Sequence, residues 1–128
     1  MKRTPLTRKT PLRAKAGLKG GGTIKTKRKP RLAATSAEQR HMSRVAVGSC
    51  IACGSHKDIV IHHIMHAPGK TKRRDHRFVS RLCAQCHNIS NRSVHLLGSE
   101  RAFLEATGVD LVAWAMAQWD KSCALEQP

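Results

Sequence analysis

The chain has 128 residues, with 24 Lys and Arg against 8 Asp and Glu, which gives a formal net charge of +16 and a pI near 10.8. A chain of this length has room for one small domain, with or without a tail, and buries a core of modest size. The positive charge favours a polyanionic partner, nucleic acid above all, because each neutralised phosphate releases condensed counterions. An anionic membrane surface is the rival partner. We find no sustained apolar face in the basic segment, no run long enough to span a bilayer and no signal peptide, so we expect a cytoplasmic protein without membrane association.

The N-terminal third carries most of the excess charge. Residues 1–40 hold 13 of the 24 basic side chains and one acid, Glu38. Proline and glycine recur there, and single apolar residues follow a six-residue spacing that suits neither helix nor strand: Leu6, Leu12, Leu18 and Ile24. Because so little apolar surface cannot offset the entropy of ordering the chain, we predict a disordered basic arm over residues 1–35. The arm would bind phosphates; the alternative is a tail that only increases solubility.

We place a folded domain at residues 36–128, and its first predicted element is a short helix. Ser36, with Gln39 three residues later, forms a capping-box pattern. The helix is expected to end near Val45.

Two strands and a further helix are expected in the middle of the domain. β-branched residues at 59–61 predict a strand that runs into a pair of histidines, and residues 78–82 can supply a second strand. A helix should begin near Cys86. These elements predict a small α+β fold.

Two helices are predicted at the C-terminal end. Ser99 can cap the first, which ends at Gly108, and Asp110 can cap the second, which runs to about Ala124. Several side chains of these helices are predicted to lie in the core rather than against bases: Phe103, Trp114, Trp119 and Cys123.

Four of the five cysteines form two C-x-x-C pairs, Cys50 with Cys53 and Cys83 with Cys86. The disulfide framework of a secreted protein would need a secretory signal and usually an even number of cysteines. Two such pairs predict instead one closed, tetrahedral site for a structural zinc ion. The alternative, redox-active or merely buried cysteines, would leave a thin core for a domain of this size.

Eight histidines lie between positions 41 and 95. His62 and His63 are adjacent, so on a strand they point to opposite faces unless the strand end twists. One ring could then ligate a metal while the other reaches a water or a substrate. Three other histidines are predicted to be structural or to contribute only charge: His41, His56 and His66.

The segment Ile61-His62-His63-Ile64, followed by Leu82-Cys83-Ala84-Gln85-Cys86-His87, resembles the two halves of an HNH (ββα-metal, His-Me finger) endonuclease, a hairpin and then a helix, pinned by a Cys₄ zinc. The stretch from about Arg40 to Val112 is similar to the phage recombination-enhancement (Ref-type) nucleases, described as RecA-dependent endonucleases. Further matching features are Arg40-His41-Met42, Arg44-Val45-Ala46, His76 seven residues before Cys83, and Val94-His95.

The resemblance implies a ββα-metal core and the hydrolysis of phosphodiester bonds in DNA. His63 would be the general base, while His62 and His87 would hold one divalent cation, Mg²⁺, Mn²⁺ or Zn²⁺. The implied partners are single-stranded DNA or a recombination intermediate, and a RecA-type recombinase filament, in the cytoplasm of a bacterial or phage-infected cell.

The sequence also departs from the HNH pattern. Phe78 stands where most zinc-knuckle HNH proteins carry an Asn that orients the general base. His76 is the nearest polar substitute, as in the Ref-type pattern, and we assign it an orienting role. His95 is predicted to be a third metal ligand or a phosphate contact. For both histidines a surface or hydrogen-bonded structural role is the alternative.

A basic loop joins the histidine pair to the second cysteine pair, and Asp75 is its only acid. On an HNH fold the loop would lie beside the metal and bind the phosphates that flank the scissile bond; a solvated charged loop is the alternative. Its predicted nucleic-acid contacts are Lys70, Lys72, Arg73, Arg74, Arg77 and Arg81. The alternative function for the whole chain is a non-catalytic, zinc-containing module that binds nucleic acid.

Overall fold

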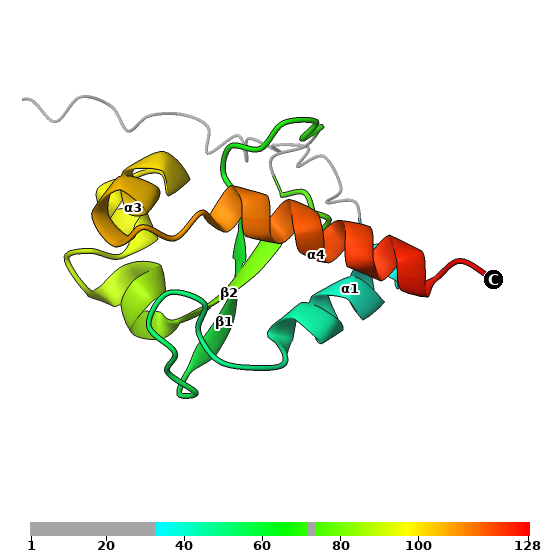
Figure 1. Cartoon of the computed structure of the whole chain (residues 1–128), viewed down its shortest axis with the longest axis horizontal. Helices are drawn as coiled ribbons and strands as arrows, with labels where there is room; N and C mark the ends of the chain where they lie inside the picture. Colours follow the sequence, from blue (N-terminus) through cyan, green and yellow to red (C-terminus); the bar gives the residue numbers. More distant parts are fainter. Residues whose placement is uncertain (1–32, 72–73) are drawn as a thin grey trace, which may run out of the picture. The chain divides into compact units, whose positions relative to one another are not determined.

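The computed structural model describes residues 33–71 and 74–128, so the predicted arm at 1–35 lies almost entirely outside the described residues. Within them, two strands, four α-helices and one short π-helix form a small α+β fold, as predicted (Figure 1). In chain order the elements are α1 Ser36–Ala46, β1 Ile59–His63, β2 Val79–Cys83, η1 Gln85–Ile89, α2 Val94–Leu97, α3 Glu100–Thr107 and α4 Leu111–Leu125.

The two strands form an antiparallel sheet with Ile59 opposite Cys83 and His62 opposite Ser80. The second strand begins one residue later than predicted, at Val79, and it is buried at four of its five positions. The register brings the start of β1 to the second cysteine pair and leaves the histidine pair at the other end of the strand. The sheet thus separates the cysteines from the histidines.

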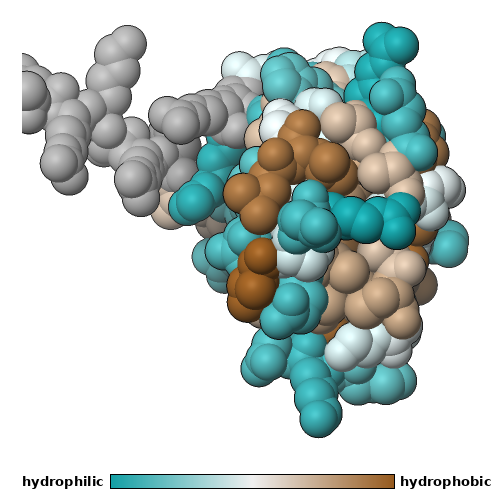
Figure 2. Space-filling view, turned by 90° about the vertical axis from the view of Figure 1, so that its left-hand side faces the viewer, coloured by the Kyte–Doolittle hydropathy of each residue, from teal (hydrophilic) through white to brown (hydrophobic). Residues whose placement is uncertain are grey.

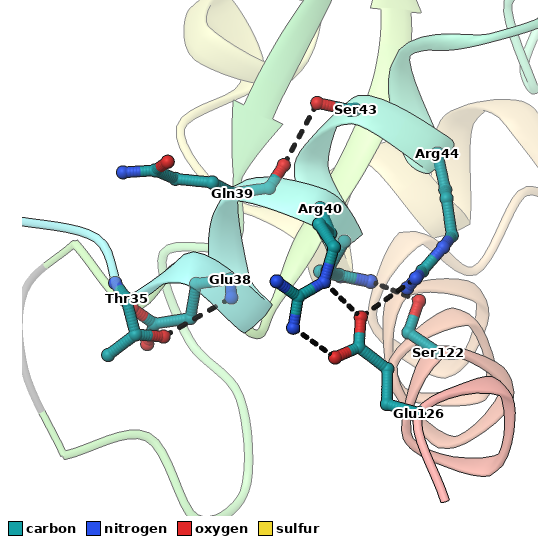
Figure 3. Close-up of polar contacts among 9 residues, drawn as sticks. Thr35, Glu38, Gln39, Arg40, Ser43, Arg44, Ser122 and Glu126 are labelled. Carbon is teal, nitrogen blue, oxygen red and sulfur yellow. Dashed lines mark hydrogen bonds and ion pairs between the residues drawn. The ribbon is translucent and has the colours of Figure 1, made fainter. Parts of the chain in front are cut away.

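The cap of α1 lies one residue before the predicted one. The Thr35 hydroxyl accepts the Glu38 N–H at 3.2 Å, and the Glu38 carboxylate accepts the Thr35 N–H at 2.8 Å (Figure 3). These reciprocal bonds satisfy two of the backbone donors that a helix N-terminus leaves open. The predicted pairing of Ser36 with Gln39 was therefore wrong, because Thr35 and Glu38 have the same spacing one position earlier.

Polar contacts hold α1 against the end of α4. Glu126 accepts hydrogen bonds from Arg40 and Arg44 of α1, each with one contact of 2.8 Å (Figure 3). Between the same two helices, Nδ1 of the buried His41 lies 2.8 Å from the hydroxyl of Ser122. A structural position for His41, as predicted, is confirmed.

The core lies between the sheet and the helices. Helix α1 contacts both strands, α4 contacts β2 and α1, and α3 packs on α4 at the end away from α1 (Figure 1). Phe103 is fully buried, as predicted, and Phe78 joins it in the same cluster. The prediction for Cys123 was wrong: it is exposed and Ser122 is buried in its place, because Ser122 lies seven residues after Ala115 on the inner face of α4.

The segment after β2 differs from the expected regular helix. The helix predicted near Cys86 is the five-residue π-helix η1, and a four-residue helix that was not predicted, α2, follows it. Gly98, with φ of +86°, ends α2 in the left-handed region. The two short helices turn the chain so that residues eight positions apart, His87 and His95, face each other.

The surface carries several exposed hydrophobic side chains, among them Val47, Ile89, Leu96 and Leu125. On the face drawn in Figure 2 the most hydrophobic residues form patches that hydrophilic side chains separate. Among the described residues, no helix is both long enough and apolar enough to cross a bilayer.

Candidate metal centres

The four paired cysteines lie together, as predicted. Their sulfur atoms all lie within 4.8 Å of one another, and Sγ of Cys53 is 3.6 Å from Sγ of Cys83. Zinc bound tetrahedrally by thiolates at about 2.3 Å keeps its sulfur ligands about 3.8 Å apart. The spacing of the four thiols therefore suits a structural zinc ion.

Local backbone structure gives the first cysteine pair its shape. The Gly54 N–H donates to the Cys50 carbonyl at 2.8 Å, and the Cys50 N–H donates to the Ser55 carbonyl at 2.8 Å. This tight turn, with Gly54 at φ of +76°, brings the thiols of Cys50 and Cys53 to one side. The second pair leaves the end of β2 and enters η1.

The thiols of this cluster titrate unequally. Burial would raise the pKa of Cys50, but backbone N–H groups of Cys83, Cys53 and Ala52 outweigh burial and lower the pKa to about 7. Burial and the neighbouring thiols raise the pKa of Cys86 above its ordinary value. One thiolate is thus favoured and further ones repel it, so a bound cation is needed to hold all four as thiolates.

Three histidines form a second cluster at the other end of the sheet. His62 comes from the end of β1, His87 from η1 and His95 from α2. One ring nitrogen from each lies within 4.8 Å of the other two, and the Nε2 atoms of His87 and His95 are 3.1 Å apart. His62 is buried, His87 is half-buried and His95 is exposed, so one side of the cluster faces solvent.

The histidine cluster fits a divalent cation. Nδ1 of His62 is buried and has no hydrogen-bond partner among the residues that the structure describes, which is costly for a polar atom unless it has a ligand. Imidazoles bound to zinc at about 2.0–2.1 Å place their nitrogens about 3.3 Å apart in a tetrahedron. Burial, and then His95 and His62, lower the pKa of His87 to about 4, which keeps it in the neutral form that binds metals.

His63 forms a separate pair with His76 rather than joining the three-histidine cluster. Its Nε2 lies 3.0 Å from Nδ1 of His76, so one nitrogen donates a proton and the other accepts it. Burial, His76 and the charge of Arg74 lower the pKa of His63 to about 4. The imidazole of His63 is therefore neutral near neutral pH, and it follows His62 directly in the chain.

Half of the predicted phosphate contacts already bind the chain's own backbone or side chains. The Lys70 ammonium donates to the carbonyls of Ile64 and Met65 at 2.7 Å. The Arg77 guanidinium holds the buried carboxylate of Asp75 at 2.7 and 3.0 Å, and this pairing lowers the pKa of Asp75 to about 2. These contacts shape the loop that carries His76.

Arg81 lies on β2, where it supports the first cysteine pair. Its guanidinium donates to the carbonyls of Val47 and Ser49 at 2.7 Å each. Gly48 between them has φ of +121°, and a Cβ there would come within 2.8 Å of the guanidinium. Arg81 thus holds the segment that leads into the first cysteine pair. Of the other predicted contacts, Arg74 is exposed, while Lys72 and Arg73 lie outside the described residues.

One buried acid, Glu100, was not predicted from the sequence. Its side chain is 3% exposed, Oε1 lies 3.2 Å from Nε2 of His62, and the same oxygen accepts the Met65 N–H. Burial would raise the pKa of Glu100, but these donors outweigh burial and lower it to about 2. An acid in the first turn of a helix is ordinarily a surface residue that the helix dipole stabilises. The position of Glu100 in the sequence therefore does not indicate its contact with His62.

The two remaining histidines are placed near the surface. His56 is exposed in the segment after the first cysteine pair, and the side chain of His66 is 80% exposed with Nδ1 3.7 Å from Glu100.

Comparison with protein-family models, curated proteins and solved structures finds no match to this chain. A function must therefore be inferred from the two clusters and their surroundings.

Proposed function

We propose that the chain is a metal-dependent DNA endonuclease of the HNH type that hydrolyses phosphodiester bonds. The observation that carries the proposal is the convergence of His62, His87 and His95 on one site, while His63, the next residue along β1, pairs with His76. The order of β1, β2 and η1 along the chain is the one expected of a ββα-metal core, with His62 and His63 on β1 and His87 on η1. The net charge of +16 favours DNA as the substrate.

Each group has a role in this proposal. A divalent cation held by the three histidines would stabilise the negative charge that develops at the scissile phosphate and the leaving oxygen. His63 would take the proton of the attacking water at Nδ1, since its Nε2 faces His76. His76 would keep the His63 ring in place, and Arg74 would contact a flanking phosphate.

A non-catalytic zinc module that binds nucleic acid is the second candidate, and the four cysteines with the basic charge favour it equally. Such a module has no use for three converging histidines or for a buried imidazole nitrogen without a hydrogen-bond partner. The count of bound cations therefore separates the two candidates.

We expect two cations per intact chain, one at the cysteines and one at the histidines, and nicking of plasmid DNA with Mg²⁺ or Mn²⁺. His87→Ala should keep the cysteine-bound zinc but lose the second cation and at least about 10-fold of the nicking rate. Elemental analysis and a supercoiled-plasmid assay give both readouts. A chain that binds only the thiolate-bound ion during turnover would leave the zinc module as the function.

The similarity to Ref-type nucleases makes a RecA-type filament the proposed activator. The same plasmid assay, and one with single-stranded DNA, should be run with and without a recombinase filament. Cutting that appears only with the filament, and is lost in His87→Ala, would support this narrower proposal; equal cutting without the filament would contradict it.

Removing residues 1–32 should weaken DNA binding and flatten its salt dependence. This segment holds 12 of the 24 Lys and Arg residues, and each phosphate contact contributes about −0.9 to the slope of log K against log salt. Fluorescence anisotropy over a salt series measures both quantities. A chain in which a neutral Gly/Ser segment of equal length replaces the arm controls for length. If affinity and slope survive both changes, the arm is not the main DNA contact.

A further inference from the structure

Only one of the three clustered histidines is fully buried, and it is tied to an acid from a distant part of the chain. His62 is 1% exposed, and its Nε2 lies 3.2 Å from the carboxylate of Glu100 on α3. The same carboxylate accepts the N–H of Met65, two residues after β1 ends. Glu100 thus connects α3 to the end of the strand that carries the histidine pair.

The two donors to Glu100 have a consequence for the His62 ring. A buried, ionised carboxylate only accepts hydrogen bonds, so the Nε2 atom of His62 must carry the proton. In the tautomer whose single proton is on Nε2, the ring has its lone pair on Nδ1, which is the buried atom without a hydrogen-bond partner in the described part of the chain. A lone pair held in this way is what a metal ligand needs.

We propose that Glu100 is the positioning residue of the histidine-bound cation: it fixes the Nε2–H tautomer and the orientation of His62 so that Nδ1 faces His87 and His95. The inference rests on the metal centre of the proposed function but not on DNA cleavage. Through Glu100, α3 becomes part of the support of the metal centre.

The fold supplies a rigid base for this carboxylate. Ser99 caps α3 by accepting the Ala102 N–H at 3.1 Å, and Phe103 on the next turn is fully buried. Glu100 is the first residue of this anchored helix, so its carboxylate has little freedom to leave His62. A solely structural role for Glu100, as the acceptor for Met65, would leave the ligand strength of His62 unchanged.

The tautomer can be measured without any substitution. Long-range ¹H–¹⁵N NMR on the full chain, with zinc at the cysteines and the histidine cluster free of metal, distinguishes the two protonated nitrogens of His62. We expect the proton on Nε2 near neutral pH. A singly protonated ring with its proton on Nδ1 would overturn the proposal.

Cobalt titration measures the effect on the cation. With zinc at the cysteines, Co²⁺ bound by imidazoles shows d–d absorption without the charge-transfer band of thiolates. We expect Glu100→Ala to weaken Co²⁺ binding by about 10–100-fold, and Glu100→Gln, which keeps an acceptor oxygen, to weaken it less. Glu105→Gln on the same helix is the matched control, because Glu105 is exposed and pairs with Arg101; it should bind Co²⁺ like the unchanged chain.

The outcomes separate the inference from the nuclease proposal. Unchanged Co²⁺ affinity in folded Glu100→Ala would overturn the role of Glu100 while leaving the metal centre intact. No Co²⁺ binding by the unchanged chain would overturn both. If Co²⁺ binding follows the expected order and the unchanged chain still does not cut DNA, the role of Glu100 stands and the endonuclease proposal fails.

Discussion

Stripping zinc from the four cysteines is expected to unfold the folded part of the chain. Among the described residues only eleven hydrophobic side chains are buried, and two of them are Cys50 and Cys83. The cysteine cluster is therefore part of a small core. Structural zinc contributes about 10–16 kcal/mol of binding free energy in zinc-finger peptides, which is comparable to the whole stability of a typical domain, about 5–15 kcal/mol.

Circular dichroism and NMR dispersion, before and after a strong chelator, measure this loss, and added Zn²⁺ should restore both signals. The Cys83→Ser chain should not bind zinc tightly at the three remaining cysteines, and it should lack a cooperative thermal transition. Cys123→Ser is the matched control, because Cys123 is exposed on α4 and lies outside the cluster. A metal-free chain that keeps native dispersion and a cooperative transition would show that the zinc is dispensable for folding.

Most of the clustered cysteines and histidines could be predicted from the sequence, because the spacing of the cysteine pairs is local and the family resemblance names two of the histidines. Two C-x-x-C pairs each require only one tight turn, and strand pairing then brings Cys53 to Cys83. His62 and His87 were expected together from the family resemblance, and the structure brings them together. Alternation along a strand also predicted that His63 would leave the cluster that His62 joins.

The supporting residues could not be predicted because their partners are distant in sequence. Glu100 is 38 residues from His62, and its burial depends on how α3 packs. Arg81 was grouped with the loop cations, since charge alone does not distinguish a phosphate contact from a donor to the carbonyls of Val47 and Ser49. The place of α2, which turns His95 toward His87, likewise depends on tertiary packing rather than on local propensity.

These contacts give His62 and His63 different surroundings, and the roles proposed for the histidines can be tested separately. The ring of His62 contacts an acid and its Nδ1 is buried, as suits a ligand, whereas His63 is paired with a second imidazole, that of His76. The same strand end thus offers two imidazoles with different surroundings. Substitution of His63 should therefore change the rate of cleavage, whereas substitution of a clustered histidine should change the binding of the cation.

His63→Ala is expected to lower the nicking rate by about a hundredfold to ten-thousandfold, the usual contribution of a general base, while leaving both cations bound. His87→Ala, in contrast, should lose the second cation together with activity. The supercoiled-plasmid assay and elemental analysis on the same preparations distinguish these two patterns. His56→Ala is the matched control, because His56 is an exposed histidine outside both clusters, and it should nick at the unchanged rate.

Chemical rescue tests whether the lost ring acts as a base or only as a packing element. Free imidazole added to His63→Ala should restore part of the nicking rate, in proportion to the concentration of its neutral form, and should leave His87→Ala inactive. Equal nicking by His63→Ala and the unchanged chain would remove the assigned base. Loss of activity together with loss of the second cation in His63→Ala would instead place His63 in the support of the metal centre, because a base acts on the water and not on the affinity for the cation.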